Sequence, residues 1–325
     1  MKTTGLLLLL AVALLALASC AGEEKAGGGA SSGLANREDI RIVVVTHGSA
    51  SDPFWSVVKN GVDQAASDMG VEVEYRAPDT FDVVEIQRNL DAAIASEPDG
   101  IALSVVDPDA LEGSIREATD SGIPLVVLNT GREVWRELGA LTYVGQTEYE
   151  AGVAAGERMA ESGVTNALCI NQEQGNVALD QRCEGFEEGL GGSVEQVAVE
   201  GTDPTEAQNG IETALSQNSD ANGMLTLGPQ GAEPGLAALE ASGRSGEITF
   251  GTFDLGSSIL NAVRNGEMLF AIDQQQFLQG YLPVTILTDY VQYRVRPIGE
   301  VRTGPEFVTQ GEAGEVIELS DQGLR

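Results

Sequence analysis

Residues that carry much of enzyme and nucleic-acid chemistry are scarce in this 325-residue chain. Its one histidine is His47, so no His-Glu-x-x-His zinc motif exists, and a Ser-His-Asp arrangement would have to use this side chain. Lysine occurs only as Lys2, Lys25 and Lys59. Nucleic-acid binding requires clustered Lys and Arg, and the formal net charge here is −32. We therefore expect no nucleic-acid partner.

Nucleotide-binding and catalytic motifs are also missing. No G-x-x-x-x-G-K-[ST] loop occurs, no G-x-G-x-x-G follows a strand, and no nucleophile-elbow sequence is present. We expect no cofactor and no enzyme activity. A lipid-anchored hydrolase stays open as a minor alternative, because any two of the many acidic residues could form a glycosidase pair.

The acidic surface keeps a protein soluble and monomeric, since like charges repel between molecules. Two origins fit the composition: a genome of high GC content, which favours Arg over Lys, and a saline habitat, where counterions screen the self-repulsion. The sequence does not separate them.

The first 19 residues read as a secretory signal: Lys2, an apolar run from Leu6 to Ala18, and small residues at its end. The run is shorter than the roughly 20 residues that span a bilayer. "LASC" looks like a bacterial lipobox, which predicts cleavage before Cys20 and its lipidation; the alternative is an ordinary signal with an incidental cysteine. Residues 20–39 are rich in Gly, Ala and Ser and predict a flexible tether. We expect an extracytoplasmic body anchored to the cell membrane through Cys20.

With Cys20 lipidated, Cys169 and Cys183 form an even pair in an oxidising compartment, which predicts a disulfide bond. A single histidine and no third ligand nearby argue against zinc and other metal sites.

From Ile42 onward, short β-branched runs alternate with segments of helical periodicity. "IVVVT", "GIALSVV" and "IPLVVLN" are strand-like, and a second series begins near residue 147 with "ALCIN", "GMLTLG" and "EITFGTFD". Such alternation predicts an α/β protein with parallel sheets covered by helices on both faces. Two series predict two similar lobes joined by a multi-strand hinge. Ligands of such sheets bind beyond the carboxyl ends of the strands, where this chain places polar, Gly-rich segments.

One strand-loop-helix segment, "VVVTHGSASDPFWSVVKNGVDQAASDMGVEV", resembles the opening of the ribose-type family of periplasmic sugar-binding proteins, whose first loop ends in Asn-Pro-Phe-Phe. The resemblance continues through "PDGIALSVVDPDAL", "GIPLVVLNTG", "DQRCEGF", "GTFDLGSSILNAVRNGEMLFAID" and "QQQFLQGY". Gene repressors share this fold but begin with a DNA-binding helix-turn-helix, and this chain begins with a lipobox.

The resemblance implies a first lobe of residues 40–144 plus 275–305 and a second of 145–274 plus 306–325. It also implies a cleft in which aromatic rings cover the faces of a sugar and polar side chains satisfy its edge. The expected ligand-binding residues are His47, Asp52, Phe54, Trp55, Ser104, Asp107, Asn129, Arg182, Asp254 and Gln274.

Several of these positions have an alternative interpretation. Phe54 could pack beneath its helix so that only Trp55 reaches the cleft. His47 could be a solvated loop residue, and Trp135 could be either a lip of the cleft or a hydrophobic anchor. "DPDALEG" at Asp107 resembles the start of a calcium loop but fits a helix cap better.

The chain departs from the ribose-type pattern at two sites: Asn129-Thr130 replaces an Asp-Arg clamp, and Gly228-Pro229 replaces an Asn-Asp pair. Another pentose, a polyol or a deoxysugar therefore fits as well as ribose. The function implied is capture of a neutral monosaccharide or polyol for an ABC importer, with the membrane permease as partner. A sugar-sensing receptor that signals to a chemoreceptor or sensor kinase is the alternative.

Overall fold

The computed structural model describes residues 35–49 and 52–325. The predicted signal, Cys20 and the tether as far as residue 34 lie outside these residues. The described chain begins beside a short 3-10 helix, η1 (Arg37–Asp39), which leads directly into the first strand. Within the described residues, no helix has the length and apolar character needed to cross a bilayer.

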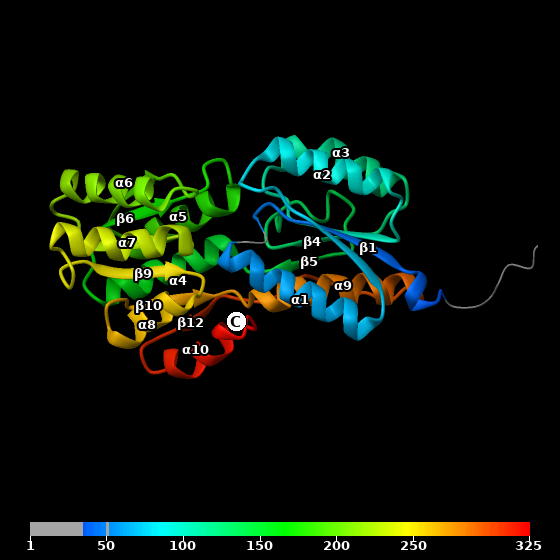
Figure 1. Ribbon diagram of the computed structural model, residues 1–325. Helices are drawn as coiled ribbons and strands as arrows, with labels where there is room; N and C mark the ends of the chain where they lie inside the picture. Colours follow the sequence, from blue (N-terminus) through cyan, green and yellow to red (C-terminus); the bar gives the residue numbers. More distant parts are fainter. Residues whose placement is uncertain (1–34, 50–51) are drawn as a thin grey trace, which may run out of the picture. The chain divides into compact units, whose positions relative to one another are not determined.

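The first lobe is built on a parallel six-stranded sheet with the strand order β11-β5-β4-β3-β1-β2. Its central strands are buried on both faces, which explains their β-branched runs. Helices α1 and α9 pack on one face, and α2 and α3 on the other (Figure 1). The strands are β1 (Arg41–Val45), β2 (Glu72–Arg76), β3 (Gly100–Leu103), β4 (Leu125–Leu128), β5 (Thr142–Gly145) and β11 (Val301–Arg302). The helices are α1 (Pro53–Met69), α2 (Val83–Ala95), α3 (Pro108–Asp120) and α9 (Gln276–Tyr293).

The second lobe repeats this plan with the order β12-β10-β9-β8-β6-β7. Strand β12 runs antiparallel to β10 at the edge, so the predicted all-parallel arrangement is correct except there. One face is covered by α4 and α5, the other by α6, α7, α8 and α10. The strands are β6 (Asn166–Asn171), β7 (Ser193–Ala198), β8 (Gly223–Thr226), β9 (Thr249–Phe253), β10 (Phe270–Asp273) and β12 (Glu306–Val308). The helices are α4 (Glu148–Glu161), α5 (Val177–Leu190), α6 (Pro204–Gln217), α7 (Pro229–Ser242), α8 (Ser257–Asn265) and α10 (Ala313–Asp321). The predicted two-lobe α/β fold is confirmed.

Three short connections join the two sheets: residues 146–147, 274–275 and 303–305. The C-terminal segment makes a further contact between the lobes. Asn60 of α1 donates from Nδ2 to the carbonyl oxygen of Gly323 at 3.1 Å, and the final residue, Arg325, donates to Asp273 at 2.6 Å.

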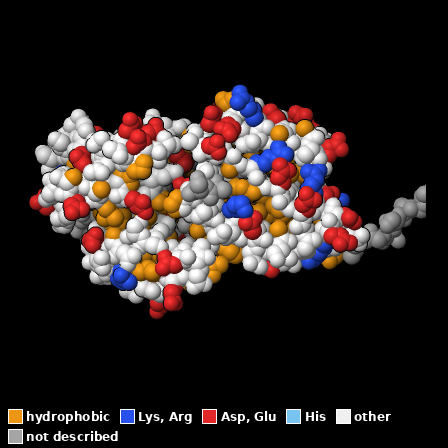
Figure 2. Space-filling model, in the orientation of Figure 1, with side chains coloured by type: hydrophobic (Ala, Val, Ile, Leu, Met, Phe, Trp, Pro, Cys, Tyr) orange, Lys and Arg blue, Asp and Glu red, His pale blue; other side chains and the backbone are white. Residues whose placement is uncertain are grey.

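Acidic side chains are spread over both lobes on the face that Figure 2 shows, with the basic side chains in fewer places. On that face the acidic excess of the sequence lies at the surface, since charged groups stay in water unless they are paired.

Helices α4 and α5 pack backbone to backbone through glycines. A Cβ at Gly152 of α4 would collide with the carbonyl oxygen of Arg182, and one at Gly185 of α5 with that of Tyr149. This close approach brings the start of α4 against the middle of α5. It sets the position of two charged side chains in the site described below.

Cys169 of β6 and Cys183 of α5 are joined by a disulfide bond. The bond lies on the face of the second sheet that α4 and α5 cover. Their Cα atoms are 5.9 Å apart and 14 positions apart in sequence. The bond fixes α5 to the strand from which the polar rim segment 172–176 extends.

Replacing both cysteines, as Cys169→Ala/Cys183→Ala, should lower the free energy of unfolding by roughly 3 kcal/mol, because the bond restricts the unfolded chain over a loop of about 15 residues. Urea denaturation of the variant and the parent measures this. Free thiols at both positions, found by alkylating the unfolded, unreduced protein, would contradict the bond.

Candidate binding site

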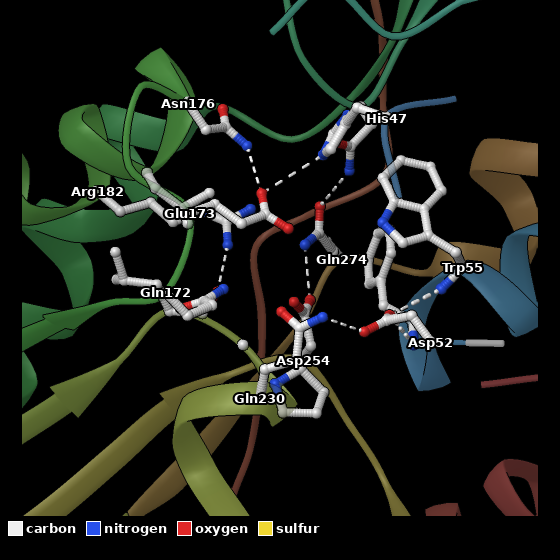
Figure 3. A pocket seen from close by; sticks show the side chains of 16 residues that line it. His47, Asp52, Trp55, Gln172, Glu173, Asn176, Arg182, Gln230, Asp254 and Gln274 are labelled. Carbon is white, nitrogen blue, oxygen red and sulfur yellow. Dashed lines mark hydrogen bonds and ion pairs between the residues drawn. The ribbon is translucent and has the colours of Figure 1, made fainter. Parts of the chain in front are cut away.

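A cavity of about 30 Å³ lies where the carboxyl ends of the two sheets face each other. Its lining comes from both lobes, as expected for sheets of this type. Figure 3 shows the polar side chains converging on it from opposite sides. The lining residues are His47, Asp52, Phe54, Trp55, Asn129, Gln172, Glu173, Asn176, Leu179, Arg182, Leu227, Gly228, Pro229, Gln230, Asp254 and Gln274.

An aromatic wall closes the side of the first lobe. Trp55 lies edge-on to Phe54, with ring centroids 4.9 Å apart, and to His47, at 4.5 Å. Both Phe54 and Trp55 line the cavity and also belong to the core beneath α1. The indole lies directly against Gly48, where a Cβ would collide with it. The glycine in this loop therefore allows the tryptophan to fold back over it.

Asp52 begins α1 and also reaches the second lobe. Its Oδ1 accepts from the backbone N–H groups of Phe54 and Trp55 at 2.9 and 3.3 Å, which is an N-cap. Its Oδ2 accepts from Gln230 of α7 at 2.6 Å. Both oxygens therefore have protein partners in this structure, and Oδ2, which accepts a single hydrogen bond, has a further lone pair for a ligand hydroxyl.

His47 is buried between the lobes and is not the solvated loop residue of the alternative interpretation. Its Nδ1 lies 2.9 Å from Oγ of Ser104, and its Nε2 lies 3.7 Å from Oε2 of Glu173 in the second lobe. Burial, reinforced by the charge of Arg182, lowers the pKa of His47 to about 3. The imidazole is therefore neutral at physiological pH.

Arg182 enters the cavity from α5 and is 3% exposed. Its Nε donates to Oε2 of Glu148 at 2.5 Å, its Nη1 donates to the carbonyl oxygen of Leu227 at 2.8 Å, and its guanidinium carbon lies 4.4 Å from the ring centroid of Phe253. An arginine has five N–H donors, so three remain without a partner among the described residues. These three are available to a ligand.

A chain of side-chain amides links the two lobes across the floor of the cavity. Gln274 donates to Oδ1 of Asp254 at 2.6 Å and accepts from Gln279 at 3.0 Å. Asn129 donates to Oε1 of Gln279 at 3.0 Å. Asn129 and Asp254 have positive φ values of 62° and 69°, a region that short polar side chains tolerate better than others.

Two carboxyl groups of the site have raised pKa values. Burial raises the pKa of Asp254 to about 7, against the opposing effects of Arg182 and of the Gln274 hydrogen bond. Burial likewise raises the pKa of Glu173 to about 7, against the opposing hydrogen bond from Asn176. Near neutral pH each group exists in both forms, so each can donate or accept a hydrogen bond.

The structure brings most of the predicted residues together but places two elsewhere. Ser104 lies behind His47 and contacts the cavity only through that ring. Asp107 does not line the cavity; its Oδ1 accepts from the N–H of Ala110 at 3.0 Å and caps α3, which corrects its assignment as a ligand residue. Trp135 is packed in the core of the first lobe, so it is an anchor and not a lip.

Sequence reasoning missed five polar contributors: Gln172, Glu173, Asn176, Gln230 and Glu148. The first four lie in the rim segments "NQEQGN" and "LGPQG", whose position after strands was the available signal. Glu148 had no such signal, because an acidic residue in the first turn of a helix ordinarily only offsets the helix dipole.

The described residues contain no group of three or more His, Cys, Asp or Glu side chains placed to hold a metal ion. The lining offers non-covalent contacts: apolar faces from the aromatic wall, and hydrogen bonds from amides, one arginine and carboxyl groups. Such a lining suits recognition of hydroxyl groups.

Known proteins resemble this chain over most of its length. Residues 42–294 match a family model described as a periplasmic binding protein domain. The chain is 32% identical to the solved carbohydrate transporter of Acidothermus cellulolyticus in complex with myo-inositol, with a TM-score of 0.84 over 88% of this chain and 99% of that one. It is 26% identical to the xylose/arabinose-binding protein XylF of Sulfolobus acidocaldarius, covering 83% of this chain and 71% of the relative. It is 22% identical to the D-apiose import binding protein of Actinobacillus succinogenes, covering 70% and 74%.

The family match spans well over half of the chain and includes the strands, the rim loops and the return helix α9 on which the predicted resemblance was based. That prediction is confirmed: the chain belongs to the periplasmic binding protein domain family.

Proposed function

We propose that this protein is the extracytoplasmic solute-binding component of an ABC importer and that it captures a neutral monosaccharide or polyol between its lobes. The observation that carries the proposal is the mixed lining of the cavity, where Trp55 and Phe54 offer apolar faces and Arg182, Asp254 and Asn129 offer polar edges. Sugars and polyols alternate C–H faces and hydroxyl edges in the same way.

The charge balance of the lining favours a neutral ligand over an anion. Arg182 is the one cation among the lining residues, and Glu148 already neutralises it through the 2.5 Å contact. A carboxylate or phosphate on the ligand would therefore enter beside Asp52, Glu173 and Asp254 with no free positive charge to pair with it. Burying an unpaired charge is costly.

The relatives support the same ligand class. The 32%-identical structure from Acidothermus cellulolyticus is described as a carbohydrate transporter in complex with myo-inositol, and XylF of Sulfolobus acidocaldarius is described as binding xylose and arabinose. Cyclitols and pentoses are both neutral polyhydroxyl compounds, so we infer the class and leave the individual ligand to experiment.

Capture requires the lobes to move. A cavity of about 30 Å³ holds about two water molecules, which is too little for a sugar ring. Entry must therefore separate the lobes and break the Asp52–Gln230 and His47–Glu173 contacts. The ligand then replaces these contacts on closure, and closure is a population shift driven by binding to both lobes. The membrane permease would receive the closed form.

Anchoring through Cys20 is part of the proposal, because "LASC" follows an apolar run of signal length. Cys20→Ser should move the protein from the membrane fraction to the soluble fraction of a host that processes lipoproteins. Cys169→Ser serves as the matched control, which should stay in the membrane fraction. Membrane retention of the Cys20 variant would contradict lipid anchoring.

Binding should depend on Trp55 and Asp254. A thermal-shift screen of pentoses, hexoses, polyols and inositols identifies a ligand, since binding to the folded state raises its stability by about 2.7 kcal/mol at a hundredfold excess over Kd. With the best ligand, calorimetry should show binding weakened tenfold or more by Asp254→Ala, because a ligand hydroxyl loses its buried partner. Trp55→Ala should weaken binding comparably by removing the apolar face.

Asp107→Ala is the control, because this aspartate caps α3 away from the cavity. It should cost about 1 kcal/mol of stability through the lost cap and leave the affinity unchanged. Unchanged affinity in both site variants would place the ligand elsewhere. Tighter binding of glucuronate or glucosamine than of glucose would contradict a neutral ligand.

Stability should depend on pH through Asp254. Its pKa is about 7 in the folded protein and about 3.9 in an unfolded chain, so the folded state holds the proton longer as pH rises. The stabilisation from this group is therefore complete below about pH 4 and is lost as pH rises to about 7. Asp254→Asn has no carboxyl to ionise, so we expect it to become more stable relative to the parent across that range.

Urea denaturation of parent and variant at pH 5 and pH 8 measures this difference. The exposed Asp79 provides the matched control variant Asp79→Asn. A parent-to-variant difference that is the same at both pH values would contradict the assigned protonation of Asp254.

A further inference from the structure

A second cavity is lined by residues of both lobes, and Asn129 lines this cavity as well as the first. Its volume is about 140 Å³, several times that of the first cavity. Val105 and Thr130 contribute from the first lobe, and Glu148 and Ala178 from the second. We refer to this space as the rear chamber.

Two buried polar atoms that belong to residues lining the rear chamber lack hydrogen-bond partners among the described residues: Oγ1 of Thr130 and Oε1 of Glu148. Both residues are nearly fully buried, at 3% and 4% exposed. The other oxygen of Glu148 accepts from Arg182 at 2.5 Å and from Gln146 at 2.7 Å. Buried polar atoms of folded proteins are almost always paired, so these two indicate a place for a hydrogen-bonding group.

The charged residues around the rear chamber indicate whether the hydrogen-bonding group that fits there is neutral or charged. Arg132 and Glu133 also line the chamber. The guanidinium of Arg132 is paired with Glu300 at 3.0 Å and lies 3.9 Å from Glu133, whose side chain is largely exposed to solvent. Glu148 is neutralised by Arg182, which leaves one carboxylate oxygen as an acceptor and the Thr130 hydroxyl as a donor or acceptor. The remaining lining includes the apolar Val105 and Ala178. A neutral group that carries hydroxyls fits this combination.

The volume of the rear chamber limits the number of non-hydrogen atoms in such a group. A cavity of about 150 Å³ in another protein accepts benzene, which has six non-hydrogen atoms. With the lobes spaced as they are in this structure, the chamber at about 140 Å³ can therefore hold a substituent of roughly that size, which exceeds the hydroxymethyl group of a hexose.

We propose that the rear chamber is a second subsite of the cleft and that it receives a hydroxylated substituent of a ligand whose ring lies against Trp55. This inference rests on the proposed function, because it assumes a sugar or polyol ring in the first cavity. The ligand is then a sugar or cyclitol that carries a hydroxylated substituent, such as a glycerol glycoside, within the class of neutral polyhydroxyl compounds proposed above. Its substituent passes Asn129 and hydrogen-bonds Glu148 and Thr130.

The test compares free and substituted ligands by calorimetry. The probes are D-glucose, D-galactose and myo-inositol, each free and with a glyceryl group attached through oxygen. The parent protein should bind at least one substituted probe about tenfold more tightly than its free form, the gain that corresponds to about one buried hydrogen bond.

Two variants change the rear chamber without altering a residue that lines the first cavity. Ala178→Leu fills it, and Thr130→Val removes its hydroxyl. Both should abolish the advantage of the substituted probe while changing the affinity for the free form less than twofold. Ala92→Leu, at an exposed position of α2, is the matched control and should retain the advantage. Melting temperatures establish that each variant is folded.

The outcomes separate this inference from the proposed function. A substituted probe that binds no better than its free form in the parent overturns the subsite and leaves sugar capture intact. Equal weakening of both probe forms by the two variants also overturns it, because the variants then act on the fold. If no free or substituted probe binds the parent at all, the proposed function and the subsite both fail.

Discussion

The buried ion pair between Arg182 and Glu148 of the second lobe lies where the two lobes meet, and both cavities border it. It is flanked by the first cavity on the arginine side and by the rear chamber on the glutamate side. Removing one partner of such a pair costs about 3–5 kcal/mol, since the other charge is left buried alone. The pair can form because α4 and α5 approach through glycines at Gly152 and Gly185. Backbone packing of two helices thus fixes the one cation that faces the ligand site.

The remaining polar groups of the site depend on local backbone geometry in a similar way. Asn129 and Asp254 adopt the left-handed conformation at the ends of their strands, which turns their side chains toward Gln274 and Gln279. Such conformations cost energy in non-glycine residues and persist where the surrounding structure requires them. The hydrogen bonds from Asn129 to Gln279 and from Gln274 to Asp254 hold both residues in this conformation. The same hydrogen bonds therefore determine the shape of the cavity floor.

Much of the fold was predictable from sequence, because β-branched runs and helical periodicity report burial directly. The aspartates before α1, α3 and α6 are an example: each precedes a proline and caps its helix. The site was harder to predict, because a cap and a ligand residue look alike in sequence. Asp52 and Asp107 both begin a helix with Asp-Pro after a strand, yet only Asp52 borders the cavity. Glu148 was missed because its partner is 34 residues away and only the packing of α4 on α5 brings them together.

The contact of the C-terminal segment with α1 bears on how this protein could be used as a sensor. Asn60, which holds the carbonyl of Gly323, lies on the same helix that begins with Asp52 and carries Trp55. A fluorescent domain fused after Arg325 would therefore be attached within two residues of a contact between the lobes, and the residues of this contact do not line the cavity.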